Sequence, residues 1–322
     1  MKPIVLVTKR IPKHVEEYIA RYCEYEIWDQ ERPMSRHELL EKLPNLDGII
    51  TTKEKIDKEF LEYATKVKVI SNIAVGYDNF DVDLMKSKKI IGTHTPNVLD
   101  ETVADTAFGL LIMVSRKLSY LDRFVKDGKW DKIDNELFLG KDVHNSILGV
   151  IGSGRIGEKI IRRATLGFNM KVLYHNRSRN EEIEAKYNAQ YVTKEKLIKE
   201  SDFVMILLPL NNETINYFSY DEFELMKEDA FFINISRGKV VNEKGLTEAL
   251  QKKRIAGAGL DVYEKEPIST SSALLKMHNV VTLPHVGSAS IKTRNDMAMK
   301  AAKNLVDGLY GNQPEDLIKE LK

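Results

Sequence analysis

The fold of this chain is decided by one stretch near its middle, Ser146-Ile-Leu-Gly-Val-Ile-Gly-Ser-Gly-Arg-Ile-Gly-Glu-Lys-Ile-Ile-Arg-Arg-Ala164. Its first six residues form an apolar run with the length and β-branched content of a buried strand. A Gly-x-Gly-x-x-Gly pattern follows at Gly152, Gly154 and Gly157, and a helical segment comes after it. A strand, a glycine-rich turn and a helix in this order predict a dinucleotide-binding βα unit.

Each glycine has its own role in such a unit. The first permits a tight turn, the second lets the backbone approach a pyrophosphate, and the third lets helix and strand pack closely. The helix over residues 155–164 has Ile156, Ile160 and Ala164 on one face, and its N-terminus supplies N–H groups and a positive dipole end. A turn that binds nothing is the alternative, and the flanking strand and helix argue against it.

Short apolar runs and charged helical segments alternate on both sides of this unit, which predicts α/β architecture with parallel sheets. Before it, strands are expected over residues 4–8, 25–28, 48–51, 67–73 and 90–93, with helices near 14–22, 35–43, 58–65 and 81–86. From it onward, strands are expected over residues 147–151, 171–175, 190–192, 203–208, 230–235, 257–262 and 280–283.

We interpret the chain as two doubly wound parallel-sheet domains with a cleft between them. A flavodoxin-like substrate-binding domain would comprise residues 1–99 and 286–322, and a Rossmann dinucleotide-binding domain residues 100–285. One long helix over residues 100–127 would lead from the first to the second, and a helix over 288–309 would return. Ligands of doubly wound sheets bind beyond the carboxyl ends of the strands, so we expect the site in the cleft.

Composition excludes several classes of protein. Among 322 residues, 49 Lys and Arg balance 48 Asp and Glu, and the net charge of +1 argues against nucleic acid as a partner. The longest apolar runs fall far short of the ~20 residues that span a bilayer. The single cysteine, Cys23, cannot form a disulfide within the chain, and the start of the sequence does not read as a secretory leader. A cytoplasmic protein fits best.

The residues near position 176 bear on the choice of cofactor. An acidic side chain normally binds the adenosine ribose of NAD about 20 residues after the glycines. Asn176 stands nineteen residues after Gly157, and Arg177, Ser178 and Arg179 follow it. Two guanidinium groups and a hydroxyl suit a 2′-phosphate, which predicts NADP(H) over NAD(H). The alternative is that these arginines only decorate a solvated loop.

Three polar side chains each follow a predicted strand: Arg237, Glu266 and His285. Such a set suits reduction of a 2-oxo acid, in which hydride reaches the carbonyl carbon and a proton must reach the oxygen. Arg237 would bind the carboxylate and the carbonyl oxygen, His285 would donate the proton, and Glu266 would orient the ring of His285. Each residue alone has an ordinary structural explanation, and their joint occurrence after the glycine pattern favours a site.

Further motifs occur along the chain in the order Asn72-Ile-Ala-Val-Gly-Tyr-Asp-Asn79, Thr95-Pro-Asn-Val-Leu-Asp-Glu-Thr-Val-Ala-Asp105, the glycine pattern, Pro209-Leu-Asn-Asn-Glu-Thr214, Asn234-Ile-Ser-Arg-Gly-Lys-Val-Val241, Gly259-Leu-Asp-Val-Tyr-Glu-Lys-Glu-Pro267 and Pro284-His-Val-Gly-Ser288. With them the chain resembles the D-isomer-specific 2-hydroxyacid dehydrogenases over nearly its full length. It is most similar to the branch of glyoxylate and hydroxypyruvate reductases that includes 2-ketogluconate reductases.

The resemblance implies roles for individual residues. Arg237, Glu266 and His285 match the family's catalytic triad, and the backbone N–H groups of Val75 and Gly76 match its substrate-carboxylate site. Positions that match the family's cofactor site are Thr102, Gly152, Gly154, Arg155, Ile156, Gly157, Asn176, Arg177, Ser178, Arg179, Pro209, Thr214, Ile235, Ser236, Asp261 and Gly287. Among these, Asp261 would bind the nicotinamide carboxamide and Thr102 would lie near the nicotinamide.

The resemblance also implies a homodimer that pairs through the long helix, with the apolar run 108–114 as its buried face. We expect no metal site, because the histidines lack metal-ligand spacing. The predicted function is NADP(H)-dependent reduction of glyoxylate or hydroxypyruvate to the D-2-hydroxy acid. The alternatives are a 2-ketogluconate reductase or another D-2-hydroxyacid dehydrogenase, and, from a different class, a cofactor-sensing, corepressor-like binding protein. Turnover of a 2-oxo acid distinguishes the enzymes from the binding protein.

Overall fold

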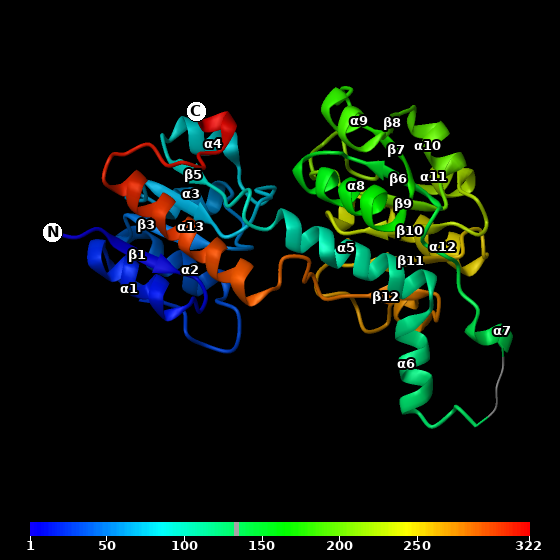
Figure 1. Ribbon diagram of the computed structural model, residues 1–322. Helices are drawn as coiled ribbons and strands as arrows, with labels where there is room; N and C mark the ends of the chain where they lie inside the picture. Colours follow the sequence, from blue (N-terminus) through cyan, green and yellow to red (C-terminus); the bar gives the residue numbers. More distant parts are fainter. Residues whose placement is uncertain (132–134) are drawn as a thin grey trace. The chain divides into compact units, whose positions relative to one another are not determined.

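The computed structural model describes residues 1–131 and 135–322. The chain divides into two compact units, Met1–Leu99 with Ala289–Lys322, and Asp100–Ser288. Each unit is built on one parallel sheet flanked by helices (Figure 1). The predicted α/β class with two parallel sheets is confirmed.

The first unit has a five-stranded sheet in the order β2-β1-β3-β4-β5. Its strands are β1 (Ile4–Val7), β2 (Glu24–Ile27), β3 (Gly48–Thr51), β4 (Val69–Asn72) and β5 (Ile91–Thr93). Its helices are α1 (Lys13–Tyr22), α2 (Arg36–Lys42), α3 (Lys58–Tyr63), α4 (Val82–Ser87) and α13 (Ile291–Leu309). Every residue of β3 and β4 is buried, as expected of inner strands covered on both faces.

The C-terminal part of the chain completes the first unit. Ser71 of β4 donates a hydrogen bond from its Oγ to the carbonyl oxygen of Ala301 in α13, at 2.8 Å. A Cβ atom on Gly48 would lie 2.9 Å from the side chain of Leu305, so this glycine allows helix and strand to approach. Leu317 then forms an antiparallel bridge with Thr93 at the edge of the sheet.

The second unit has a seven-stranded sheet in the order β12-β11-β10-β9-β6-β7-β8. Its strands are β6 (Ile147–Ile151), β7 (Lys171–His175), β8 (Gln190–Tyr191), β9 (Phe203–Ile206), β10 (Phe231–Asn234), β11 (Gly257–Leu260) and β12 (Val280–Thr282). Its helices are α5 (Asp100–Ser115), α6 (Leu118–Lys126), α7 (Asn135–Phe138), α8 (Arg155–Phe168), α9 (Glu181–Tyr187), α10 (Lys194–Glu200), α11 (Tyr220–Leu225) and α12 (Glu243–Gln251). The order of strands reverses between β6 and β9, where doubly wound sheets bind their ligands.

The prediction of one helix over residues 100–127 is wrong. Two helices occupy this range, α5 and α6, and Lys117 between them has a left-handed φ of 54°. A left-handed residue cannot continue the helical hydrogen-bond ladder. The break is stabilised from outside the helix, because the backbone N–H of Lys141 donates to the carbonyl of Ser115 at 2.9 Å.

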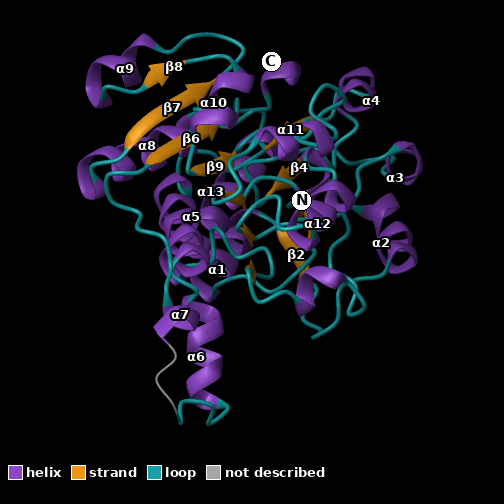
Figure 2. Cartoon of the chain, turned by 90° about the vertical axis from the view of Figure 1, so that its right-hand side faces the viewer, coloured by secondary structure: helices purple, strands orange, loops and turns teal. Residues whose placement is uncertain are grey.

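Part of the apolar run of α5 is buried inside its own unit, whereas Gly109, Ile112 and Met113 of the same run are half-buried. Phe108 stacks on Phe168 of α8 with ring centroids 5.1 Å apart, and Leu110 lies against Gly259 of β11. In contrast, none of the residues of α6 is buried. Figures 1 and 2 both show α6 projecting away from the sheet of its unit.

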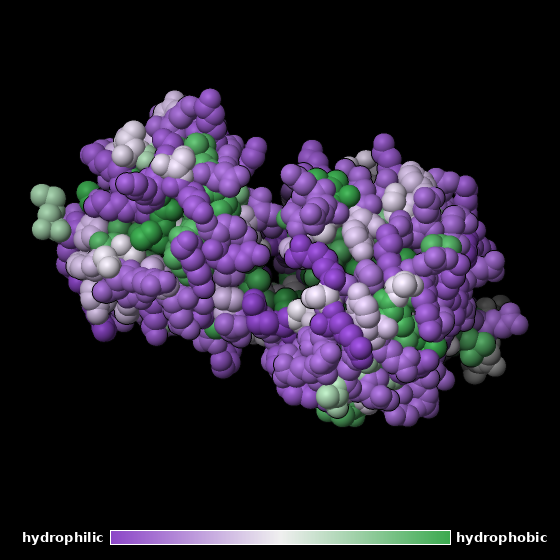
Figure 3. Space-filling model, turned by 90° about the horizontal axis from the view of Figure 1, so that it is seen from above, coloured by the Kyte–Doolittle hydropathy of each residue, from purple (hydrophilic) through white to green (hydrophobic). Residues whose placement is uncertain are grey.

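Figure 3 shows hydrophilic residues over most of the visible face, with separate hydrophobic patches. Within residues 1–131 and 135–322, every helix is too short or too polar to cross a membrane.

Packing in the core of the second unit predicts how truncation of one aromatic side chain affects stability. Phe232 of β10 is fully buried, and its ring centroid lies 4.8 Å from that of Phe218 and 5.3 Å from that of Phe223. The substitution Phe232→Ala should lower the free energy of unfolding by about 3–5 kcal/mol, because it leaves a cavity. Urea denaturation followed by circular dichroism measures the change. The control Leu166→Ala, at a side chain that is 73% exposed, should change it by less than about 0.5 kcal/mol; similar losses in both variants would contradict the prediction.

Candidate functional site

The candidate residues of the second unit gather along one edge of its sheet. All the strands are parallel, so their carboxyl ends share that edge. In the order of the sheet, the residues that follow these ends are His285 (β12), Asp261 (β11), Arg237 (β10), Pro209 (β9), Gly152 (β6) and Asn176 (β7). Residues more than a hundred positions apart in the sequence therefore line one edge.

The glycine turn after β6 has room for a bound group. Gly152 has a φ of +100°, and a Cβ on Gly157 would lie 2.5 Å from the carbonyl oxygen of Gly152, so the fold itself requires both glycines. Gly154 is exposed, and its Cβ would meet no atom of the described chain within 4 Å. Gly154 also caps the N-terminus of the 14-residue helix α8. This geometry fits a pyrophosphate, which would approach the backbone where Gly154 carries no side chain.

Asn176 ties the end of β7 to the glycine turn. Its Oδ1 accepts a hydrogen bond from the backbone N–H of Ser153 at 2.8 Å, and its Nδ2 donates to the Oγ of Ser153 at 2.6 Å. Ser153 is buried. This serine is not among the residues predicted from the sequence, because its role depends on a contact with the neighbouring strand.

The two arginines beside Asn176 differ in their surroundings. Arg179 donates from Nε and Nη2 to the carboxylate of Glu184 at 2.5–3.0 Å, and these hydrogen bonds lower the pKa of Glu184 to about 2. Arg177 is 89% exposed and lies 3.8 Å from Glu213. Ser178 between them is exposed. Arg177 is therefore the cation better placed to meet a ligand, whereas Arg179 is bound to α9.

Two further predicted cofactor residues stabilise the unit itself. Arg155 donates from Nε to Oδ2 of the buried Asp100 at 3.2 Å, which joins the first turns of α8 and α5. After β9, Thr214 donates from Oγ1 to the carbonyl of Pro209 at 2.6 Å and accepts from the N–H of Asn211 at 2.8 Å. Thr214 thus closes its own loop.

The turn that carries Arg237 is built on a buried amide. Asn234 accepts at Oδ1 from the N–H and the Oγ of Ser236, at 3.0 and 2.9 Å, and donates from Nδ2 to the carbonyl of Arg237 at 3.1 Å. Asn234 is 1% exposed. Asn234 is not among the site residues predicted from the sequence, although an Asn at a strand end is a typical signal for an Asx turn.

The turn after β10 lies directly against the loop after β11. A Cβ on Gly238 would lie 1.8 Å from the backbone of Tyr263, so the two backbones touch at this glycine. Ile235, buried in the same turn, lies against Gly287 in the turn after β12. The three turns that carry Arg237, Glu266 and His285 are therefore packed side by side.

Glu266 and His285 form a hydrogen-bonded pair. The Nδ1 of His285 lies 2.7 Å from Oε2 of Glu266, and both side chains are about a third exposed or less. A carboxylate accepts, so Nδ1 carries the proton of this hydrogen bond. His285 has a left-handed φ of 56°. Such a conformation costs free energy in a non-glycine residue and persists where neighbouring contacts enforce it.

Asp261 supplies contacts that enforce this turn. Its Oδ1 accepts from the N–H of Val286 at 2.7 Å and its Oδ2 from the N–H of Gly287 at 2.8 Å. Asp261 is 1% exposed, and burial raises its pKa. The carbonyl of Gly287 in turn accepts from the Oγ1 of Thr106 at 3.0 Å. Asp261 and α5 together hold the peptides that follow His285.

Thr102 lies in the first turns of α5, and its carbonyl accepts from the Oγ1 of Thr106 at 3.1 Å. The helix therefore brings the backbone of Thr102 close to the turn that carries His285. Ile156 is half-buried in the first turn of α8.

Val75 and Gly76 lie in the first unit, in the turn after β4. The carbonyl of Gly76 accepts from Nδ2 of the buried Asn72 at 2.9 Å, and the carbonyl of Val75 lies 2.8 Å from Nδ1 of His94. Within the described residues, no acceptor takes the N–H of Val75 or of Gly76. The turn therefore presents two backbone donors, as the binding of a carboxylate requires.

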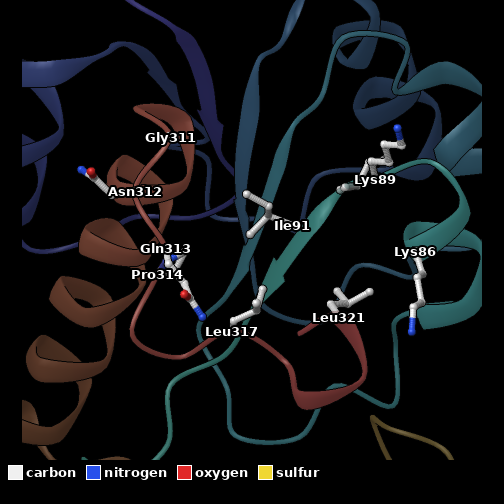
Figure 4. Close-up of a pocket in the computed structure, with 10 residues that line it drawn as sticks. Lys86, Lys89, Ile91, Gly311, Asn312, Gln313, Pro314, Leu317 and Leu321 are labelled. Atoms are coloured by element: carbon white, nitrogen blue, oxygen red, sulfur yellow. The ribbon is translucent and has the colours of Figure 1, made fainter.

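A cavity of about 420 Å³ in the first unit lies away from this turn. Figure 4 shows its lining, in which Ile91 from the amino end of β5 and Leu317 and Leu321 from the C-terminal segment supply the apolar part. The candidate turn follows the carboxyl end of β4, at the opposite edge of the sheet. In the described part of the chain, no three His, Cys, Asp or Glu side chains gather as metal ligands would.

Comparisons with known proteins agree on the family. Residues 108–287 match the family described as D-isomer specific 2-hydroxyacid dehydrogenase, NAD binding domain. The chain is 43% identical to the glyoxylate reductase of Pyrococcus horikoshii, covering 99% of this chain and 96% of that protein. It is 41% identical to the glyoxylate/hydroxypyruvate reductase B of Escherichia fergusonii, covering 99% and 98%.

A solved structure shows the same fold. It is the NADPH-dependent glyoxylate/hydroxypyruvate reductase of Sinorhizobium meliloti in complex with NADP and malonate. It superposes with a TM-score of 0.87 at 30% identity, over 100% of this chain and 98% of that one. Together with the match over residues 108–287, these likenesses confirm the predicted resemblance: the chain belongs to the D-isomer-specific 2-hydroxyacid dehydrogenases.

Proposed function

We propose that this protein reduces glyoxylate or hydroxypyruvate to the D-2-hydroxy acid with NADPH. The observation that carries the proposal is the Glu266–His285 pair, 2.7 Å apart, in a turn packed beside the turn of Arg237 at the ligand-binding edge of the sheet. The names of two relatives, glyoxylate reductase and glyoxylate/hydroxypyruvate reductase B, support the substrate class.

The cofactor would lie along the edge of the second unit, with its pyrophosphate at Gly152, Gly154 and Gly157 on the N-terminus of α8. When bound in its reduced form, it supplies the hydride that reaches the carbonyl carbon. Asp261 and Thr102, next to the turn of His285, would lie near the nicotinamide. Residues 100–285 would thus act as the dinucleotide-binding domain, and residues 1–99 and 286–322 as the substrate-binding domain.

In this proposal, side chains of the protein stabilise the negative charge on the carbonyl oxygen and supply the proton that this oxygen receives. Arg237 would bind the substrate through its planar guanidinium and stabilise the negative charge that develops on the carbonyl oxygen. His285, as imidazolium, would donate its Nε2 proton to that oxygen, and Glu266 would hold the ring through Nδ1. The N–H groups of Val75 and Gly76 would bind the carboxylate of the substrate.

Arg177 supports the preference for NADP(H). Its guanidinium is 89% exposed beside Asn176, where a carboxylate for the ribose of NAD is missing. Arg179 and Ser178 would complete the 2′-phosphate site, although Arg179 is also bound by Glu184. The solved relative that carries NADP in its name supports the same choice, and NAD(H) is the alternative.

We also propose a homodimer in the cytoplasm. The surface of α6 supports the dimer, because no residue of this helix is buried and Leu118 and Val125 are 46% and 51% exposed. The single cysteine, Cys23, is buried and unbridged, which suits a reducing compartment.

The initial rate of cofactor oxidation tests the function. Glyoxylate, hydroxypyruvate and 2-ketogluconate are each assayed with NADPH and with NADH. We expect NADPH to be preferred with glyoxylate or hydroxypyruvate. Turnover with NADH alone would overturn the cofactor assignment, and no turnover with any of the three would overturn the proposed reaction.

Removal of the proton donor or of the guanidinium should stop the reaction. We expect His285→Ala and Arg237→Ala each to lower kcat/KM for glyoxylate at least about a hundredfold, because an acid and a charge-stabilising donor are lost. The dissociation constant for NADPH, measured by fluorescence titration, should stay within about twofold. The control His144→Ala, at an exposed histidine, should behave as wild type. Wild-type rates in either active-site variant would refute the assigned roles.

Removal of Arg177 should act on one cofactor more than on the other. The substitution Arg177→Ala should raise KM for NADPH about tenfold or more, because a charge-assisted contact with the 2′-phosphate is lost, and should leave KM for NADH within about twofold. Steady-state kinetics with both cofactors measure the difference. Arg21→Ala, at an exposed arginine of the first unit, is the control. An equal change for both cofactors would mean that Arg177 does not contact the 2′-phosphate.

A charge on α6 should weaken the dimer. We expect wild type to sediment as a dimer and Val125→Asp to shift the equilibrium toward monomer, because the variant would bury a carboxylate at the interface. Analytical ultracentrifugation over a range of protein concentrations measures the shift. Leu166→Asp, at an exposed apolar residue of α8, is the matched control. A monomeric wild type, or equal effects of both substitutions, would contradict the proposed interface.

A further inference from the structure

His94, which follows β5, holds the turn of Val75 and Gly76. Its Nδ1 lies 2.8 Å from the carbonyl oxygen of Val75. A carbonyl oxygen only accepts hydrogen bonds, so Nδ1 carries the proton and donates it. The imidazole ring meets the ring of Tyr77 edge to face, with centroids 5.3 Å apart at 90°. His94 is therefore fixed both by a hydrogen bond and by a ring contact.

This hydrogen bond determines where one backbone donor points. The carbonyl of Val75 and the N–H of Gly76 belong to the same planar, trans peptide, so they point in opposite directions. By holding the carbonyl of Val75, His94 aims the N–H of Gly76 away from itself. The preceding peptide is held in the same way, because the N–H of Thr95 donates to the carbonyl of Ala74 at 2.9 Å and so fixes the N–H of Val75.

The C-terminal segment holds His94 in turn. The N–H of His94 donates to the carbonyl of Asp316 at 3.2 Å, and the carbonyl of His94 accepts from Nδ2 of Asn304 at 3.3 Å. Asn304 and Asp316 are buried, and they hydrogen-bond to each other at 3.1 Å. Lys300 binds the carboxylate of Asp316 at 2.8 Å. This buried network connects α13 to the backbone on both sides of the His94 side chain.

The ring partner of His94 is also bound by the C-terminal segment. The hydroxyl of Tyr77 donates to Oε2 of Glu320 at 3.1 Å. Residues of the last turn of the chain thus restrain the tyrosine that packs against the imidazole. All these residues belong to the first unit.

We propose that His94 is a positioning residue for substrate binding. It fixes the Val75–Gly76 peptide so that the N–H of Gly76 is aimed at the carboxylate of the 2-oxo acid, and the C-terminal segment keeps His94 in place. The inference rests on the proposed function, since it takes the turn of Val75 and Gly76 as the carboxylate site. In this proposal His94 acts through the peptide that it holds.

Two substitutions separate the hydrogen bond from the ring. His94→Phe keeps a ring against Tyr77 and removes the donor, and His94→Asn removes the ring and keeps a donor near the place of Nδ1. We expect His94→Phe to raise KM for glyoxylate about tenfold, the cost of one hydrogen bond to a binding turn, with kcat and the dissociation constant for NADPH within about twofold. His94→Asn should keep KM within about threefold of wild type. His14→Phe, at an exposed histidine, is the control.

Binding without turnover provides a second measurement. Oxamate, an unreactive carboxylate, is titrated calorimetrically into the NADPH-loaded enzyme. Its affinity should fall about tenfold in His94→Phe and little in His94→Asn. If His94→Asn does not fold, His94→Phe alone decides, and thermal melting shows whether each variant is folded.

The outcomes distinguish this inference from the proposed function. Turnover by wild type with an unchanged KM and an unchanged oxamate affinity in His94→Phe would overturn the role of His94 alone. If both variants showed the same fall in kcat and the same rise in KM, His94 would be merely a structural residue, and its proposed positioning role would be overturned. No turnover of any 2-oxo acid by wild type would overturn the proposed function and this inference together.

Discussion

Parallel pairing of β10, β11 and β12 is the constraint on which the candidate site depends. Asn234 pairs with Leu260, and Leu260 pairs with Thr282, so the three strands end at the same level. The turns that follow them then start side by side, and Gly238 lets two of them touch. A slip of one strand by a single residue would reverse which side chains face the core, so the hydrophobic core also fixes the register of the site.

Buried polar side chains convert these strand ends into defined turns. Asn72, Asn234 and Asp261 are each at most 1% exposed, and each binds the backbone of the turn that follows its own strand or the neighbouring one. A buried amide or carboxylate is costly unless its hydrogen bonds are made, and here backbone groups of the turns make them for all but the Oδ1 of Asn72, which has no hydrogen-bond partner among the described residues. The same bonds that satisfy these side chains hold the candidate residues in place, so stability and preorganisation have one source.

Sequence patterns predict the sheets well because most of the strands are short, mainly apolar runs between charged helical segments. They also predict the strand-end residues, since Arg237, Glu266 and His285 each follow such a run. The patterns fail where a tertiary contact decides the local structure. The helix break at Lys117 contains neither Gly nor Pro, so no local sequence signal predicts it. It is stabilised by the N–H of Lys141, 24 residues away, which donates to the carbonyl of Ser115. The roles of Ser153 and His94 likewise depend on neighbouring strands, which no local spacing reveals.

The left-handed backbone of His285 shows how tertiary contacts determine the local conformation of a candidate site residue. A histidine at a φ of 56° is strained, and the strain is tolerated because Asp261 binds the next two N–H groups and Thr106 binds the carbonyl of Gly287. The geometry of the Glu266–His285 pair is therefore maintained from the peptides that follow the histidine, and the carboxylate of Glu266 adds a contact that orients the ring. An imidazole held at both its backbone and its Nδ1 has Nε2 as its other ring nitrogen, and this is the atom that the proposed proton donation would use.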